Sequence, residues 1–247
     1  MGIEMINNGI TSNLHELKEA TAAIKEKGRG LSVQPPGQNS EVWNLRVKFR
    51  KVGRLQFISH LDLARTMRTA IIRAEIPVKY SQGFNPHPRM SFALQLSVGT
   101  QSNCEFMELK LNEAPDCAKI KSELNKNLVD ELRVLDVYEP ERKASEIAWA
   151  EYSIIFYPES FEKLPDYNEI IGDTLVISKR TKSGEKNVDI RSQILRFSQS
   201  DNVLRAVLCA DNTSYLNPEY VAKLAGITDY DIIRERCFLS DGVTEFK

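Results

Sequence analysis

The chain has 247 residues, of which 42% are apolar and 27% charged, and its formal net charge at pH 7 is −1. This length allows one large domain or two domains of about 100 residues each. No stretch approaches the roughly 20 apolar residues that span a bilayer, and the first residues lack the basic start and apolar run of a signal peptide. We therefore expect a cytoplasmic protein without a membrane segment.

The cysteines are spread along the sequence, with no Cys-x-x-Cys pair and no histidine at ligand spacing: Cys104, Cys117, Cys209 and Cys237. Free thiols are expected, because a zinc site or an iron–sulfur cluster needs several soft ligands that converge. The sequence also lacks a Ser-His-Asp order, a His-Glu-x-x-His motif and a phosphate-binding P-loop. No catalytic constellation, metal site or cofactor is therefore predicted.

The first 42 residues are expected to form a loosely attached arm. Residues 12 to 27 have the apolar spacing of a short amphipathic helix, which Gly28 and Gly30 end. The proline- and glycine-containing residues 34 to 40 then have the chemistry of a linker. No function is assigned to this arm.

Residues 43 to 145 are predicted to form a first domain. Residues 44 to 51 alternate between apolar and basic side chains, as a half-buried strand does. Ser59 and Asp62 resemble a capping box at the start of a helix. The order strand, helix, strand, strand, helix, strand follows over residues 44–51, 59–74, 76–80 merged with 91–98, 105–111, 115–128 and 132–138.

Residues 146 to 247 repeat this order in a predicted second domain. The expected segments are residues 152–157, 160–171, 174–179, 188–197, 203–209, 218–224 and 232–239. Two such series predict an α+β chain of tandem ferredoxin-like (βαββαβ) domains, in which antiparallel sheets have helices on one face.

Positive charge is concentrated in one segment. Residues 44 to 90 contain ten lysines and arginines but only two acids, Asp62 and Glu75, a local charge of +8. Arg46, Lys48 and Arg50 are expected to point outward from the free face of the first sheet, spaced by roughly 6 to 7 Å, close to the phosphate repeat of a nucleic-acid strand. Phe106 and Lys110 are expected to join them, although such charges can also serve only to keep a sheet solvated.

Two short segments near this strand contain the remaining candidate residues. Gly53 and Arg54 form a predicted turn with an exposed guanidinium. His60 lies in the first turn of the predicted helix. Its role is either structural, packing at the helix start, or functional, as an RNA contact or a general base. His87, flanked by two prolines, lies in a stiff loop that either presents binding residues or only connects two strands.

Near residue 190, a carboxylate and a guanidinium are expected on one strand face two residues apart. An ordinary cross-strand ion-pair role is predicted for this pair, Asp189 and Arg191.

The segments Phe57-Ile-Ser-His-Leu-Asp-Leu-Ala-Arg65 and Tyr80-Ser-Gln-Gly-Phe-Asn-Pro-His-Pro-Arg89 support a family resemblance, together with residues 91–99 and 189–191. Over residues 44 to 240 the chain resembles the bacterial radical-SAM-associated domain family of unknown function. Ser192 stands where that pattern has a proline, and the arm lies outside it. The resembling motif residues are Ser59, His60, Asp62, Gly83, Asp189 and Arg191.

The resemblance implies association with a radical-SAM protein, either as a separate chain or as a fusion. The sequence has no Cys-x-x-x-Cys-x-x-Cys loop for the radical-SAM cluster, so the chain is not expected to be the radical enzyme itself.

The leading hypothesis is a non-catalytic RNA-binding or substrate-recognition module that acts with a radical-SAM partner in RNA modification or a translation-linked process. The predicted phosphate contacts are Arg46, Lys48, Arg50, Arg54 and Arg89, and the predicted base contacts are Tyr80, Phe84 and Asn85. His87 is also expected to bind the nucleic acid. One alternative is a metal-independent RNA endonuclease similar to CRISPR repeat-processing enzymes, with His60 and His87 as acid–base candidates. The other is a protein-interaction scaffold that binds no nucleic acid.

Overall fold

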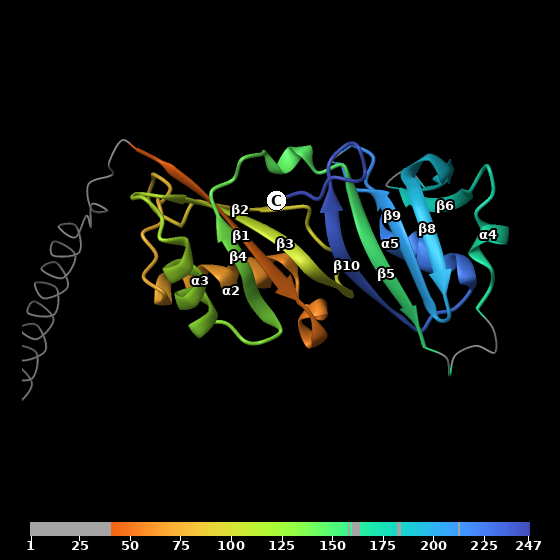
Figure 1. Ribbon diagram of the computed structural model, residues 1–247, viewed down its shortest axis with the longest axis horizontal. Coiled ribbons are helices and arrows are strands. Elements are labelled where there is room, and N and C mark those ends of the chain that lie inside the picture. Colours follow the sequence, from red (N-terminus) through yellow and green to blue (C-terminus); the bar gives the residue numbers. More distant parts are fainter. Residues whose placement is uncertain (1–40, 158, 160–163, 182–183, 212) are drawn as a thin grey trace, which may run out of the picture. The chain divides into compact units, whose positions relative to one another are not determined.

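The computed structural model describes residues 41–247 except 158, 160–163, 182–183 and 212 (Figure 1). The predicted arm, residues 1–42, therefore lies almost wholly outside the described part. Residues 39–247 form one compact unit. The predicted division of this unit into two domains at residue 145 stays a prediction.

Strands dominate the described chain, and most of its helices are short. The helices and 3₁₀ helices are η1 (Gly53–Phe57), α2 (His60–Arg73), α3 (Cys117–Lys126), η2 (Ala144–Glu146), α4 (Tyr167–Ile170), η4 (Arg191–Gln193), α5 (Pro218–Ala222) and η5 (Lys223–Ala225). The strands are β1 (Trp43–Lys51), β2 (Met90–Ala93), β3 (Thr100–Leu111), β4 (Leu132–Tyr138), β5 (Trp149–Phe156), β6 (Val176–Thr181), β7 (Gly184–Asp189), β8 (Ile194–Ser200), β9 (Val203–Cys209) and β10 (Tyr230–Phe238).

One large sheet runs through both halves in the order β4-β1-β3-β10-β5-β9-β8, as Figure 1 shows. On the β3 edge opposite β1, β2 pairs with residues 106–109 and β10 with residues 100–102. The β3–β10 pairing is parallel, and the other pairings in this sheet are antiparallel. The fold is therefore α+β with a mostly antiparallel sheet.

Both halves place their strands in the same order. The first half is arranged β4-β1-β3-β2, and the second half is arranged β10-β5-β9-β8. Between β5 and β8 the second half inserts α4 and a hairpin of β6 and β7, which form a two-stranded sheet of their own. The single extended segment predicted over residues 188–197 is wrong, because η4 separates β7 from β8.

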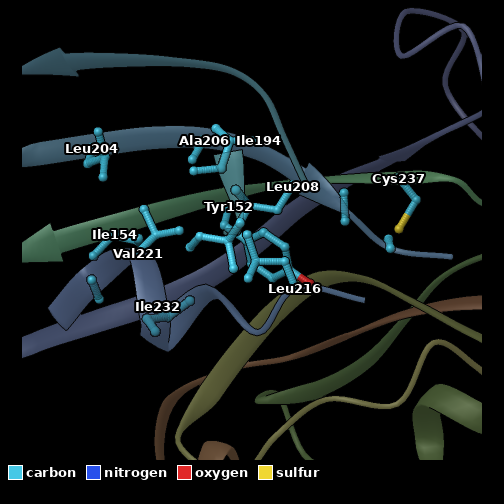
Figure 2. Packing of buried hydrophobic residues seen from close by; sticks show 14 of the residues in the cluster. Tyr152, Ile154, Ile194, Leu204, Ala206, Leu208, Leu216, Val221, Ile232 and Cys237 are labelled. Atoms are coloured by element: carbon cyan, nitrogen blue, oxygen red, sulfur yellow. The ribbon is translucent and has the colours of Figure 1, made fainter. Parts of the chain in front are cut away.

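Two hydrophobic cores lie on opposite faces of the sheet. The first core joins α2 and α3 to β1 and to Met107 and Leu109 of β3. The second core contains α5 together with Cys104 and Phe106 of the same strand. Figure 2 shows Val221 of α5 in this core with Tyr152 of β5. Since β3 is a regular strand between these positions, neighbouring residues point to opposite faces. The helices α2 and α3 therefore cover one face of the sheet, and α5 covers the other.

Local geometry changes three predicted boundaries. The strand expected over residues 91–98 ends at Ala93, and Leu94 adopts a positive φ of 42°. Residues 76–80 contribute only isolated bridges, at Val78 and Tyr80. In the helix expected over residues 160–171, only residues 167–170 are helical, as α4; residues 164–166 are not, and residues 160–163 lie outside the described part. Within the described ranges, no helix is both long and apolar enough to cross a membrane.

Candidate nucleic-acid interface

The alternation predicted for β1 is confirmed. Its apolar side chains are buried in the first core: Leu45, Val47 and Phe49. Arg46, Lys48 and Arg50 lie on the opposite side of the strand, as expected. The prediction that these three side chains are exposed is wrong for Arg46, which is 0% exposed.

Both terminal nitrogens of the buried Arg46 guanidinium are hydrogen-bonded, whereas its Nε has no hydrogen-bond partner among the described residues. Its Nη2 donates to Glu108 Oε1 at 2.5 Å and to the main-chain oxygen of Arg142 at 2.7 Å. Its Nη1 donates to the main-chain oxygen of Lys247 at 2.9 Å. A guanidinium that is engaged in this way is not free to bind a phosphate.

The neighbouring basic groups of β1 are also engaged. Lys48 Nζ lies 3.1 Å from Glu245 Oε1, and its side chain is only partly exposed. Arg50 donates from Nε and Nη2 to the main-chain oxygen of Asp130. Phe106, expected as an outward stacking ring, is buried. A role of these residues in binding nucleic acid stays a prediction. Contacts within the chain already engage the groups that would bind the phosphates.

The final segment, residues 239–247, covers the part of this face around Arg46. The sequence predicts this part of the face to be open. After β10 the backbone turns back, and Phe246 N donates to the oxygen of Cys237 at 2.8 Å. Asp241 holds the turn by accepting from the amides of residues 243 and 244. Phe246 is fully buried, with its ring edge-on to Phe106 at 5.1 Å.

Beside this covered region lies a pocket of about 430 Å³ with mixed charge. Its acidic lining residues outnumber the basic ones: Asp136, Glu139, Glu141 and Glu245 against Lys48, Arg142 and Lys247. Tyr138 also lines it, and burial raises the pKa of this phenol to about 12, against the opposing effect of Arg46. This balance of charge does not favour a polyanion.

The helix cap predicted at the start of α2 is confirmed. Ser59 Oγ accepts from the amide of Asp62 and donates to its carboxylate at 2.6 Å. The hydrogen bond from the Ser59 hydroxyl to the carboxylate, and after it the effect of Arg65, lower the pKa of Asp62. The His60 ring packs edge-on against Phe92 at 5.2 Å. Ser59 and Asp62 therefore organise the entry into the helix, and the role of His60 stays a prediction.

The loop between Tyr80 and Arg89 is closed by hydrogen bonds at its base. The amide of Ser81 donates to the oxygen of His87 at 2.8 Å, and the amide of His87 donates to Ser81 Oγ at 3.1 Å. Ser81 Oγ also lies 3.0 Å from His87 Nδ1, which is 3.2 Å from the oxygen of Asn85. The two prolines predict a rigid loop, and the contacts between Ser81 and His87 also hold its base closed.

The tip of this loop is presented to solvent. Gln82 through Pro86 are all exposed, and Phe84 is fully exposed. Gly83 adopts a φ of +131°, which a residue with a side chain would rarely take. An aromatic ring held outside the fold at the tip of a closed loop is unusual, because a side chain of this size is normally buried.

A pocket of about 320 Å³ lies at the base of the loop. Its lining includes His87, Arg89 and Lys110, with polar side chains from Ser91 and Asn44. The pairing of Asn44 with Lys110 places both on the side of the sheet that also carries Arg46. Glu108 lines the pocket too, but its carboxylate is paired with Arg46.

Arg54 is exposed on η1, as predicted, but lies far from the loop. The amide of Gly53 donates to Gln101 Oε1, which anchors η1 at the start of β3. Lys110 is nine residues farther along that strand, a span of about 30 Å at strand rise. The predicted binding residues therefore divide between the two ends of the first half.

A model of a bacterial family matches residues 44–218, a range that includes β1, α2, the loop and the strands through β9. The family is described as an uncharacterized protein conserved in bacteria (DUF2344). The chain belongs to this family. No curated protein matches the chain significantly. The matched residues of the family end at the start of α5, so β10 and the covering final segment lie beyond them.

The predicted ion pair between Asp189 and Arg191, within the family match, is replaced by main-chain contacts. Asp189 Oδ1 accepts from the amides of Leu175 and Arg191 at 2.9 Å each. These amides lower the pKa of Asp189. The Arg191 side chain donates to the main-chain oxygens of Gly172 and Ile194. Both residues shape the connection around β7.

Sequence reasoning missed a buried charge cluster where β3 meets β10. Arg234 and Glu105 form an ion pair with both side chains buried. Lys51 is buried nearby, and its Nζ donates to the oxygen of Thr100 at 3.1 Å. The available signal in the sequence was a charged residue at an inward-facing strand position. The role of such a residue can be interpreted only when its partner is known. In the described part of the chain, no group of three or more potential metal ligands converges.

Proposed function

We propose that the chain is a non-catalytic RNA-binding module that holds RNA at the loop between Tyr80 and Arg89. The observation that carries this proposal is the fully exposed Phe84 on a hydrogen-bonded loop, with exposed Arg89 and Lys110 at its base. Unstacked RNA bases stack on aromatic rings, and lysine and arginine neutralise the adjoining phosphates. The loop site needs no displacement of the final segment, unlike the face around Arg46.

Each loop residue has a role in this proposal. Phe84 provides the stacking surface, and the exposed amide of Asn85 contacts base edges. Arg89 and Lys110 hold phosphates, and the pocket between them accommodates the backbone. His87 holds the loop closed through Ser81.

The partner in this proposal comes from the sequence resemblance. We propose that the module presents RNA to a radical-SAM protein, separate or fused, in RNA modification or a translation-linked process. We also propose that both halves are ferredoxin-like units, which the matching orders β4-β1-β3-β2 and β10-β5-β9-β8 support.

The endonuclease alternative would require a histidine that is free to exchange a proton with the RNA. His60 packs against Phe92, and Nδ1 of His87 lies within hydrogen-bond distance of Ser81 and Asn85. The proposal therefore gives both histidines positioning roles. Intact RNA after prolonged incubation with the protein agrees with this assignment, and cleavage that is lost in His87→Ala contradicts it.

The decisive experiment compares two exposed phenylalanines. Binding of a fluorescein-labelled single-stranded RNA of random sequence is measured by anisotropy for the wild type, Phe84→Ala and Phe57→Ala. Loss of base stacking at Phe84 costs about 1–3 kcal/mol, or roughly 5- to 150-fold in affinity. Phe57→Ala, in η1, is the matched control and should bind normally. Equal affinities for all three proteins, or no binding by the wild type, contradict the proposal.

A further inference from the structure

The outer face of α2 combines exposed apolar side chains with arginines. Leu61 is 58% exposed and Ile72 is 53% exposed, eleven residues apart and separated by about 16 Å at helical rise. Arg65 and Arg68 lie between them at the spacing i, i+4, i+7 and i+11, which forms one stripe along the helix. The buried residues of α2 lie on the opposite side of the helix and pack in the first core.

The polar groups on this face are largely satisfied by their own helix. The Thr66 hydroxyl donates to the oxygen of Asp62 at 2.9 Å, and the Thr69 hydroxyl donates to the oxygen of Arg65 at 3.0 Å. Asp62 is engaged by Ser59 and by Arg65. A helix surface with such internally bonded hydroxyls loses little hydration when a partner covers it.

Two more exposed apolar side chains lie on segments next to the start of the helix. Phe57 is 67% exposed at the end of η1, and Val98 is exposed as well. The amide of Gly99 donates to the oxygen of Gln56 at 2.9 Å, so the backbones that carry Val98 and Phe57 are adjacent. Several large apolar side chains gathered at one end of a helix are typical of a protein interaction site.

The positive charge of this surface indicates which kind of partner fits it. Arg65, Arg68 and Arg73 are exposed on α2, against the single carboxylate of Asp62 within the helix. A second copy of this chain would oppose arginines to arginines. RNA would leave the leucine and the isoleucine without apolar contacts. An acidic partner with its own apolar stripe satisfies both features.

We infer that the surface formed by Phe57, Leu61, Arg65, Arg68 and Ile72 docks an acidic amphipathic helix of a partner protein. Apolar residues of that helix pack between Leu61 and Ile72, as ridges on one helix fill the grooves of another. Its carboxylates pair with Arg65 and Arg68. This surface is distinct from the RNA loop and does not depend on the proposed RNA binding.

The test uses synthetic helical peptides as probes, with fluorescence anisotropy as the measurement. One peptide carries leucines on one face and glutamates on the other; the second replaces the glutamates with lysines; the third replaces the leucines with serines. The wild-type protein should bind the first at least about tenfold more tightly than either of the others. Equal binding of the lysine peptide, or no binding of the first peptide, overturns the inference.

Variants of the protein separate the surface from nonspecific attraction. Leu61→Ser and Arg68→Glu should each weaken binding of the acidic peptide at least about tenfold, with unchanged circular dichroism. Val129→Ser removes an equally exposed apolar side chain outside this surface and should bind normally. Retained affinity in both α2 variants, or equal loss in Val129→Ser, would refute the assignment. RNA affinity should be preserved in Leu61→Ser, so the outcomes for the two surfaces are independent.

Discussion

The guanidinium carbon of Arg46 lies 4.6 Å from the centre of the Phe246 ring, although the two residues are 200 positions apart in the chain. The aromatic face and the cation attract each other in a site that excludes water. Glu245 pairs with Lys48 beside them. The final segment thus combines an aromatic ring and a carboxylate on the sheet face that would otherwise carry free positive charge.

Removing the ring of Phe246 should destabilise the fold strongly. We expect Phe246→Ala to lower the free energy of unfolding by about 3–5 kcal/mol, because it opens a cavity between Arg46 and Phe106. Urea denaturation followed by circular dichroism measures the change. Val243→Ala, in the same segment but exposed, should lie within about 0.5 kcal/mol of the wild type. Similar effects of both substitutions would show that the segment is not packed as described.

The buried pair between Arg234 and Glu105 should be costly to break. Arg234→Met leaves a buried carboxylate without its partner and should cost about 3–5 kcal/mol of stability. The double variant Arg234→Met/Glu105→Met should recover most of that loss. The exposed pair between Arg142 and Glu146 is the control, and Arg142→Ala should cost only about 0–1 kcal/mol. A double variant that is less stable than Arg234→Met would contradict this account.

Stability should depend on pH through Lys51. Burial lowers the pKa of Lys51 from 10.5, although Glu105 acts in the opposite direction. Between the lowered pKa and 10.5, the unfolded chain binds more protons than the folded chain at this residue, so its contribution to stability rises with pH. The stability of the wild type minus that of Lys51→Met should therefore increase from about pH 7 to about pH 10. Urea unfolding at both pH values measures it, and a constant or falling difference would show that the pKa is not lowered.

The salt dependence of RNA binding should identify Arg89 as a phosphate contact. In Arg89→Ala, the slope of log affinity against log salt concentration should become shallower by about 0.7 for single-stranded RNA. The exposed Arg236, on β10 in the second half, provides the control, and Arg236→Ala should leave the slope unchanged. Parallel slopes for the wild type and Arg89→Ala would remove Arg89 from the interface.

The sequence predicted features that depend on neighbouring residues. The alternation of β1 identified the buried side of the strand, and the spacing of Ser59 and Asp62 identified the helix cap. The prolines around His87 indicated a stiff loop. Each of these features follows from dihedral restrictions or hydrogen bonds within a few residues, which is why periodicity and residue type were sufficient.

Features that join distant segments were decided only by the tertiary structure. Arg46 has the strand position of an outward residue, but Glu108 and the final residues bury it. The Asp189 carboxylate binds main-chain amides in place of the arginine two residues away. The sequence by itself determined the alternation of β1, the cap and the concentration of positive charge. Which of those charges stay accessible depends on β10 and the last residues folding back over the sheet, because burial and pairing depend on spatial neighbours that no local pattern records.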